Sequence, residues 1–175
     1  MAYLISCSGK KTTISSQQSQ ISSLEKMTSF PELYSYRKEL IHALGISLDW
    51  SKTVPAYELY TGRVYRKIES PNWRKPTTDI IIVSALFGLI RHNELIPTYN
   101  VIMTDNIPES EEKIHDFWFK KDLNRFIDPH QDIDLLFLKY KKAFNRQGND
   151  VAFAPPILWR DKYGTHKGEW LNNQL

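Results

Sequence analysis

The chain has one cysteine, Cys7, among its 175 residues, so an internal disulfide is excluded. A single cysteine is consistent with a reducing compartment. No apolar run approaches the roughly 18 residues that a membrane-spanning helix needs, and the first residues lack the basic leader of a signal peptide. The five histidines show no spacing typical of a metal site. We therefore expect a cytoplasmic protein with no membrane contact, metal or cofactor.

The residues that are present suit one globular domain. A chain of this length can build one hydrophobic core but is too short for two ordinary domains, and 41% of its residues are hydrophobic. Residues 12–23 are rich in Ser and Gln and poor in apolar side chains, which predicts a mobile surface loop. We expect a single domain over residues 1–175.

Strands are predicted where β-branched and other apolar residues run together. Residues 80–83 are Ile-Ile-Ile-Val, a run that predicts a strand buried on both faces of an α/β sheet. Residues 2–6 predict a first strand and residues 151–154 a last short one. Residues 132–140 fit either a strand or the start of a helix.

Helices are predicted where apolar residues recur at near-helical spacing. They are expected over residues 31–44, which Gly45 ends, over residues 56–68, which follow Pro55, and over residues 109–127, which Ser110 caps. The alternating order of elements predicts an α/β fold. We expect a mostly parallel central sheet flanked by helices in a Rossmann-like arrangement of three layers.

Small and polar residues follow two of the predicted strands. Ser84 and Gly88 follow the central strand, and ligands of α/β sheets bind where strands end. A tight turn needed only for packing would give the same residues. Residues 6–11, Ser-Cys-Ser-Gly-Lys-Lys, suit a phosphate or the anionic edge of a base, although they lack P-loop spacing. No nearby histidine activates Cys7, so an inert thiol is favoured over a nucleophile.

Positive charge is concentrated in one span, although the formal net charge is only +3. Tyr60, Tyr65 and Trp73 alternate there with basic residues, a pattern suited to a groove that follows a nucleic-acid backbone. A solvated helix face with its tyrosines turned inward would give the same pattern. The candidate contacts to the DNA backbone are Arg63, Arg66, Lys67, Arg74 and Lys75.

Four ordered blocks resemble the YaaA (peroxide-stress) family and its shorter phage and bacterial relatives. The blocks are Ser6–Lys11, Pro55–Tyr65, Val83–Ile90 and Ile96–Asn100. The resemblance implies an α/β fold, DNA binding and a link to modified bases through a likeness to uracil-DNA-glycosylase-type folds. The positions that match are Ser6, Lys10, Lys11, Glu58, Tyr60, Ser84, Gly88, Tyr99 and Asn100. Glu58 and Asn100 stand where the shorter relatives usually carry Asp, so a carboxylate role does not carry over directly.

Together these features predict a DNA-binding enzyme that removes a base, such as a modified phage base, by hydrolysing its N-glycosidic bond. Glu58 is the first candidate for the carboxylate that orients water, Asp105 is the second, and the Asn100 amide could also hold that water. Helix capping by Glu58, its pairing with Arg63, and a turn at Asp105 are the structural alternatives. The candidate substrate-binding residues are Ser6, Cys7, Ser8, Lys10, Lys11, Tyr60, Tyr65, Ser84, Gly88 and Tyr99.

Two other functions fit the same residues. A non-enzymatic protein that shields DNA under oxidative stress needs the basic span but no carboxylate. An enzyme acting on free nucleotides would use residues 6–11 to hold phosphate. Under the base-excision hypothesis, we expect Ser6, Glu58, Ser84 and Tyr99 to share one pocket at the ends of the first and central strands.

Overall fold

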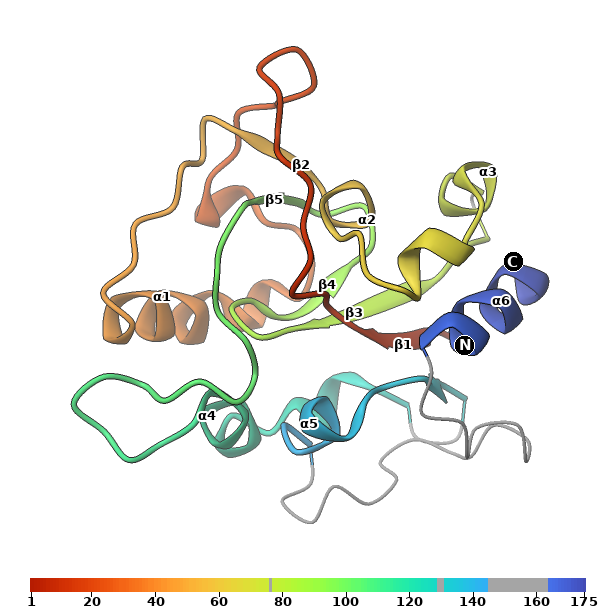
Figure 1. Cartoon of the computed structure of the whole chain (residues 1–175). Coiled ribbons are helices and arrows are strands. Elements are labelled where there is room, and N and C mark those ends of the chain that lie inside the picture. Colours follow the sequence, from red (N-terminus) through yellow and green to blue (C-terminus); the bar gives the residue numbers. More distant parts are fainter. Residues whose placement is uncertain (76, 129–130, 145–163) are drawn as a thin grey trace.

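The computed structural model describes residues 1–75, 77–128, 131–144 and 164–175, and a four-stranded sheet of order β4-β3-β1-β6 lies at its centre (Figure 1). β1 (Tyr3–Ser6) pairs in parallel with β3 (Ile80–Ser84) and with β6 (Ile133–Asp134), whereas β4 (Gly88–Arg91) runs antiparallel to β3. The predicted α/β fold is confirmed. The sheet is mixed because the chain returns directly from β3 into β4.

The two central strands are buried along their whole length. Every residue of β1 and of β3 is buried, as expected for a continuous apolar run that is covered on both faces. In Figure 1, α4 (Ile114–Lys120) and α5 (Leu138–Lys141) lie below the sheet. Above it lie α2 (Ala56–Leu59) and a two-stranded ribbon formed by β2 (Thr53–Pro55) and β5 (Leu95–Pro97).

The turn between β3 and β4 forms around Ser84 and Gly88. The Ser84 hydroxyl accepts hydrogen bonds from the Leu86 and Phe87 amides at 3.2 and 3.1 Å. Gly88 has a φ of +69°, and a Cβ atom there would lie 2.9 Å from the Trp118 ring. Only glycine meets both demands without strain. The small residues after β3 therefore make a tight turn that packs against Trp118.

One of the three predicted helices is confirmed. A 3-10 turn, η2 (Pro31–Leu33), leads into α1 (Tyr34–Ala43), and Gly45 follows at a φ of +61°. The helix predicted over residues 56–68 is wrong, because only α2 and a later 3-10 turn, η3 (Tyr65–Lys67), are helical. Between them Tyr60 forms a β-bridge with Lys11, so the backbone pairs with the loop after β1.

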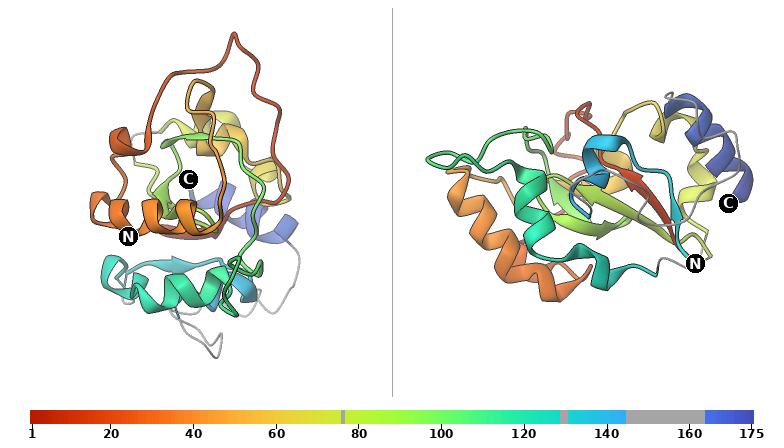
Figure 2. Two further views of the ribbon diagram at one scale, coloured as in Figure 1. Left: turned by 90° about the vertical axis from the view of Figure 1, so that its left-hand side faces the viewer. Right: turned by 90° about the horizontal axis from the view of Figure 1, so that it is seen from below.

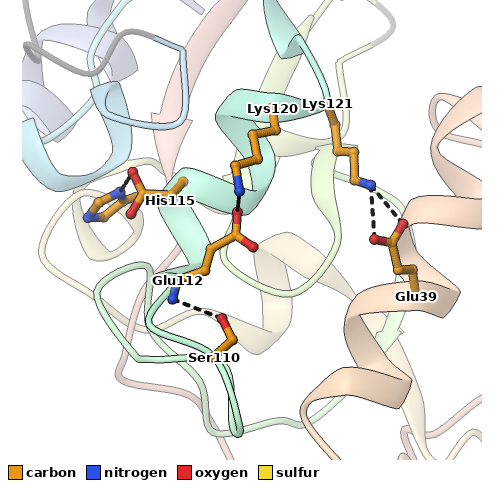
Figure 3. Close-up of polar contacts among 7 residues, drawn as sticks. Glu39, Ser110, Glu112, His115, Lys120 and Lys121 are labelled. Atoms are coloured by element: carbon orange, nitrogen blue, oxygen red, sulfur yellow. Dashed lines mark hydrogen bonds and ion pairs between the residues drawn. The ribbon is translucent and has the colours of Figure 1, made fainter.

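The long helix predicted over residues 109–127 is also wrong. Glu109 and Asp122 have φ values of +59° and +51°, which break the helical path on either side of α4. Ser110 does not cap the helix, since its hydroxyl accepts the Glu112 amide within a turn. A 3-10 turn, η4 (Leu123–Phe126), follows. Figure 3 shows how Lys121, directly after α4, reaches Glu39 of α1 at 2.8 Å.

The remaining elements are two single turns and one longer helix. They are η1 (Leu24–Lys26), α3 (Ser70–Trp73) and α6 (Gly164–Gln174). The segment 132–140 was predicted to be either a strand or the start of a helix. It contains the strand β6 and then the start of the helix α5. The strand predicted at 151–154 lies outside the described residues. Residues 12–20 form a loop that projects from the body of the molecule (Figure 2, left), and the mobility expected of residues 12–23 stays a prediction. None of the described helices has the length and hydropathy to cross a bilayer.

Buried cations satisfy carbonyl groups at both edges of the sheet. Arg37 of α1 is 1% exposed and donates to the carbonyls of Phe87 and Leu89 at 2.9 and 2.8 Å, beside edge strand β4. Lys167 of α6 donates to the carbonyls of Leu135 and Leu136, just after edge strand β6. Edge strands otherwise present unpaired backbone groups that can join another chain.

Arg37 should be required for stability, because its guanidinium also reaches the Ser29 carbonyl at 2.7 Å. We expect Arg37→Met to lower the free energy of unfolding by about 2–4 kcal/mol, since it leaves buried carbonyls without donors. Arg91→Met is the control, because Arg91 pairs with Asp79 on the surface, and it should cost within about 1 kcal/mol. Urea denaturation of both variants measures the difference, and equal losses would contradict this role for Arg37.

Candidate functional site

A pocket of about 240 Å³ opens at the carboxyl end of β1. Three segments form it: the end of β1 with the loop that follows, the segment before and within η3, and the start of α5. The residues that line it are Ser6, Cys7, Ser8, Gly9, Gly62, Arg63, Val64, Tyr65, Phe137, Lys139 and Tyr140. This is the edge of the sheet at which ligands of α/β proteins gather.

Hydrogen bonds between distant parts of the chain hold the pocket walls together. The Ser6 hydroxyl accepts the Phe137 amide at 3.0 Å, and the Ser6 carbonyl accepts the Tyr65 hydroxyl at 3.0 Å. The Cys7 thiol lies 3.3 Å from the Tyr140 hydroxyl. Since Ser6 and Cys7 sit at the end of a buried strand, the walls are fixed to the rigid sheet.

Stacked rings support one wall from behind. Tyr65 stacks on Trp73 at 5.8 Å with planes 12° apart, and Tyr57 stacks on Trp73 at 5.4 Å with planes 16° apart. Trp73 is 5% exposed. Parallel rings that are packed this closely have little freedom to rotate. The Tyr65 ring is therefore held in one orientation at the pocket.

A chain of buried hydroxyls lies next to the pocket, at the end of β3. The Tyr99 hydroxyl is 2.8 Å from Ser84 Oγ and 2.5 Å from the Tyr60 hydroxyl. Both lone pairs of Ser84 already accept backbone amides, so its hydrogen goes to Tyr99, and Tyr99 in turn donates to Tyr60. Burial raises the pKa of Tyr60 and of Tyr99 well above the usual tyrosine range. Both phenols therefore stay protonated.

Lys11 lies over this pair of rings. Its ammonium nitrogen is 4.3 Å from the centre of the Tyr99 ring and 5.7 Å from that of Tyr60. Burial lowers the pKa of Lys11, and interaction with Cys7 acts in the opposite direction. The side chain is only half-buried, so solvent and ligands can reach it.

The structure brings most of the predicted substrate-binding residues to this edge of the sheet. Ser6, Cys7, Ser8 and Tyr65 line the pocket, and Lys11, Tyr60, Ser84 and Tyr99 form the adjoining cluster. Lys10 is exposed beside them, and its amide donates to the Ser8 hydroxyl at 3.0 Å. Gly88 instead serves the turn against Trp118.

The predicted acid and amide residues lie outside the pocket lining. Glu58 is exposed, accepts the Tyr57 hydroxyl at 2.8 Å and lies 4.0 Å from Arg74, so its cationic neighbour is Arg74 in place of Arg63. Asn100 is exposed. The Asp105 carboxylate accepts the Ile102 amide at 2.8 Å, as expected for a turn residue. Of the four residues expected to share one pocket, Ser6 alone lines it, since Ser84 and Tyr99 lie in the adjoining cluster and Glu58 is exposed.

Of the five predicted contacts to the DNA backbone, Arg63 alone is among the described residues that line the pocket. Lys67 pairs with Glu169 of α6 at 2.7 Å. Lys75 donates to the Leu175 carbonyl, and Arg74 lies near Tyr57. Arg66 is exposed on η3. These four cations lie outside the pocket lining.

A family model described as "Peroxide stress protein YaaA" matches residues 1–167. The chain belongs to this family. The UPF0246 protein of Streptococcus uberis is 26% identical over 128 residues, which cover 70% of this chain and 52% of that protein. The UPF0246 protein of Francisella philomiragia is 26% identical over 119 residues, which cover 62% of this chain and 47% of that protein. The chain thus spans about half the length of the curated relatives that it matches.

Several pocket residues of this YaaA-family chain were missed from the sequence. They are Gly9, Gly62, Val64, Phe137, Lys139 and Tyr140. The signal for the last three was an aromatic and basic stretch, residues 137–142, directly after an apolar run. Its resemblance to the basic, tyrosine-rich span around Tyr65 would have pointed to a second wall of the same kind.

Gly62 should be sensitive to substitution, because its backbone touches the loop after β1. A Cβ atom there would lie 2.4 Å from Ser8 Oγ, whereas a Cβ at Gly9 would meet nothing within 4 Å. We expect Gly62→Ala to displace Ser8 and to lower the free energy of unfolding by about 1 kcal/mol. Gly9→Ala should change it by less than about 0.5 kcal/mol. Chemical denaturation of the two variants compares them, and equal stabilities would show that Ser8 moves without cost.

Proposed function

We propose that this chain binds DNA and places one extruded base in the pocket at the end of β1, where it cuts the N-glycosidic bond of that base. The observation that supports this proposal is the pairing of aromatic walls with a cationic rim. Tyr65, Phe137 and Tyr140 supply the walls, and Arg63 and Lys139 supply the rim. Enzymes that act on bases in DNA take the base out of the stack into a pocket of this kind.

The size of the pocket suits a single base. Its volume of about 240 Å³ lies below the roughly 300–1,000 Å³ of pockets for drug-sized ligands. Gly9 and Gly62 lack side chains that would fill it. Bases of any sequence can stack on aromatic side chains, because every base has a π face. Polar groups at the inner end, the Cys7 thiol and the Tyr140 hydroxyl, are available to the base edge.

The charges at the rim suit the phosphates on either side of an extruded nucleotide. Arg63 and Lys139 are both exposed and come from different segments that face the same opening. Lys10 adds a third exposed cation on the loop after β1. Contacts of this kind provide affinity without sequence preference, and they weaken as salt rises.

Asp105 is the acid candidate that we propose for the hydrolysis. Burial raises the pKa of Tyr140 above its usual range, and interactions with Cys7, with Tyr60 and, least of all, with Asp105 act in the same direction. The Asp105 carboxylate thus interacts with one residue of the pocket wall, Tyr140, whereas Glu58 is held by Tyr57 and Arg74. A carboxylate in this position would stabilise the positive charge that develops on the sugar. The family description, peroxide stress, adds bases oxidised by peroxide to modified phage bases as substrate candidates.

Binding without catalysis is the second candidate. It is favoured by the lining of the pocket, which contains no carboxylate among the described residues. In that case the pocket would hold a base, or shield a damaged nucleotide, without cutting it. The charges at the rim have the same role under both candidates.

The binding step is tested by reversing charges at the rim. We expect Arg63→Glu and Lys139→Glu to weaken DNA binding and to flatten its dependence on salt, since each removes one phosphate contact. Lys52→Glu makes the same charge change at a residue that pairs with Asp49 and lies outside the pocket lining, so it should bind like the parent chain. Mobility-shift titrations at several salt concentrations measure this. Equal losses in all three variants would mean that binding is not centred on the pocket.

The chemical step is tested by incubating the chain with duplexes that carry ordinary, oxidised, hydroxymethylated or glucosylated bases. We expect release of one class of altered base and an alkali-labile abasic site in its place, because altered bases are the least costly to extrude. Asp105→Asn should abolish release but preserve binding, whereas Glu58→Gln should preserve both. Binding without release from any substrate would favour the non-catalytic candidate.

A further inference from the structure

Lys11 has no role in the base-binding pocket as proposed, although its amine lies next to that pocket. The backbone on both sides of Lys11 is fixed by hydrogen bonds from Thr12 N to the Leu59 carbonyl and from Thr61 N to the Lys10 carbonyl, at 2.8 and 3.0 Å. The side chain therefore extends from a rigid base. It places the amine over the rings of Tyr99 and Tyr60.

Cys7 connects the amine to the pocket. It lines the pocket, and interaction with it raises the pKa of Lys11. Tyr60 provides a second connection, because its ring lies 5.3 Å from that of Tyr65 in the pocket wall. The amine and the pocket thus lie at the same edge of the sheet, and Cys7 and Tyr60 link them.

The surroundings of Lys11 favour a neutral amine over a fixed ammonium. Among the residues that the structure describes, no carboxylate forms an ion pair with its nitrogen. The titratable groups around it are Cys7, Tyr60 and Tyr99, and burial keeps both phenols protonated. Burial also lowers the pKa of Lys11 itself, by more than Cys7 raises it. Lysines in such surroundings serve enzymes as amine nucleophiles toward carbonyl groups.

We propose that Lys11 is a nucleophile that attacks the C1′ aldehyde of an abasic site in DNA. The aldehyde is the open-chain form of a deoxyribose that has lost its base. This inference rests on the proposed function in one respect, because DNA must be presented to the carboxyl edge of the sheet. It does not require the chain to remove the base itself.

The reaction needs no oxidant, reductant or metal. The Lys11 nitrogen forms a bond to C1′, and loss of water leaves an imine. Water then accepts a proton from C2′ of the protonated imine, the C3′–O bond breaks, and the electron pair leaves with the 3′ phosphate oxygen, so the strand is cut. Water hydrolyses the imine, which restores the Lys11 amine and releases an unsaturated aldehyde on the DNA end.

Borohydride trapping tests the proposal directly. The full chain is mixed with a duplex that contains one preformed abasic site, in the presence of sodium borohydride, which reduces an imine to a stable amine. We expect a covalent protein–DNA species on a denaturing gel, and mass spectrometry of its peptides should place the adduct on Lys11. Without borohydride, the same duplex should be cut on the 3′ side of the abasic site.

Two variants separate chemistry from binding. Lys11→Arg keeps a cation over the rings but removes the amine nucleophile, so the adduct and the strand cut should be lost while mobility-shift binding to the abasic duplex persists. Lys52→Arg, at a residue outside the pocket lining, should form the adduct like the parent chain. An adduct that persists in Lys11→Arg, or one that maps to another lysine, would overturn the assignment.

The pH dependence gives a readout that a merely structural lysine would not show. Because the pKa of Lys11 is lowered, the neutral amine is populated at a lower pH than for an exposed lysine. Adduct formation should therefore rise with pH and reach half its maximum below the usual lysine value of about 10.4. A midpoint at or above that value would contradict a desolvated nucleophile.

Failure of this inference can be told apart from failure of the proposed function. An adduct on abasic DNA without base release from any substrate would support Lys11 as a nucleophile and would contradict the proposed base excision. Binding of abasic DNA without an adduct would overturn the role of Lys11 and leave DNA binding intact. If the chain binds no duplex, trapping with 2-deoxyribose 5-phosphate decides the matter: labelling of Lys11 supports the nucleophile, and lack of labelling overturns it.

Discussion

The hydroxyl of Ser84 is the group on which the geometry at the carboxyl edge of the sheet depends. It accepts two amides of the following turn, which directs the chain from β3 into β4. Its hydrogen is thereby committed to Tyr99, and that of Tyr99 to Tyr60. A buried hydroxyl without a partner is costly, so these three residues specify one another's positions. Together they orient the rings over which Lys11 lies.

The helix that covers the β6 edge of the sheet also supports the pocket. Lys167 of α6 binds the carbonyls of Leu135 and Leu136, which lie directly before the pocket residue Phe137. The backbone of α6 also presses on the segment before η3, since a Cβ atom at Gly168 would lie 2.4 Å from the Val64 carbonyl oxygen. One helix therefore supports both walls of the pocket from outside. Lys167, which caps the β6 edge of the sheet, is therefore part of the architecture of the site.

The sequence was sufficient to predict the centre of the fold, because local composition decides it. The runs at residues 2–6 and 80–83 are apolar enough to be strands only in a buried sheet, and Gly45 marks the end of α1. The helices predicted at 56–68 and 109–127 were wrong for reasons that local patterns do not contain. In the first, Tyr60 pairs with Lys11 from a distant loop.

In the region of the helix predicted at 109–127, Glu109 and Asp122 adopt left-handed backbone conformations, although neither is glycine. The site residues, too, could be predicted where the local sequence determines their position and not where distant contacts do. Residues at the ends of strands, such as Ser6, Cys7 and Ser84, were located by the rule that ligands bind there. Glu58 was chosen for its chemical type alone, and the structure pairs it with Tyr57 and Arg74 on the surface. The wall formed by Phe137 and Tyr140 depends on the pairing of β1 with β6, which no local pattern indicates.

The pairing of β1 with β6 also determines when the pocket can exist. The bonds that join its walls, from Phe137 to Ser6 and from Tyr140 to Cys7, connect residues 131 and 133 positions apart. Contacts of such high sequence separation form late, because the loop between them must first be closed. While the chain is still being synthesised, the residues up to Arg63 can leave the ribosome long before the second wall does. A prematurely terminated product would carry part of the cationic rim but no cavity behind it.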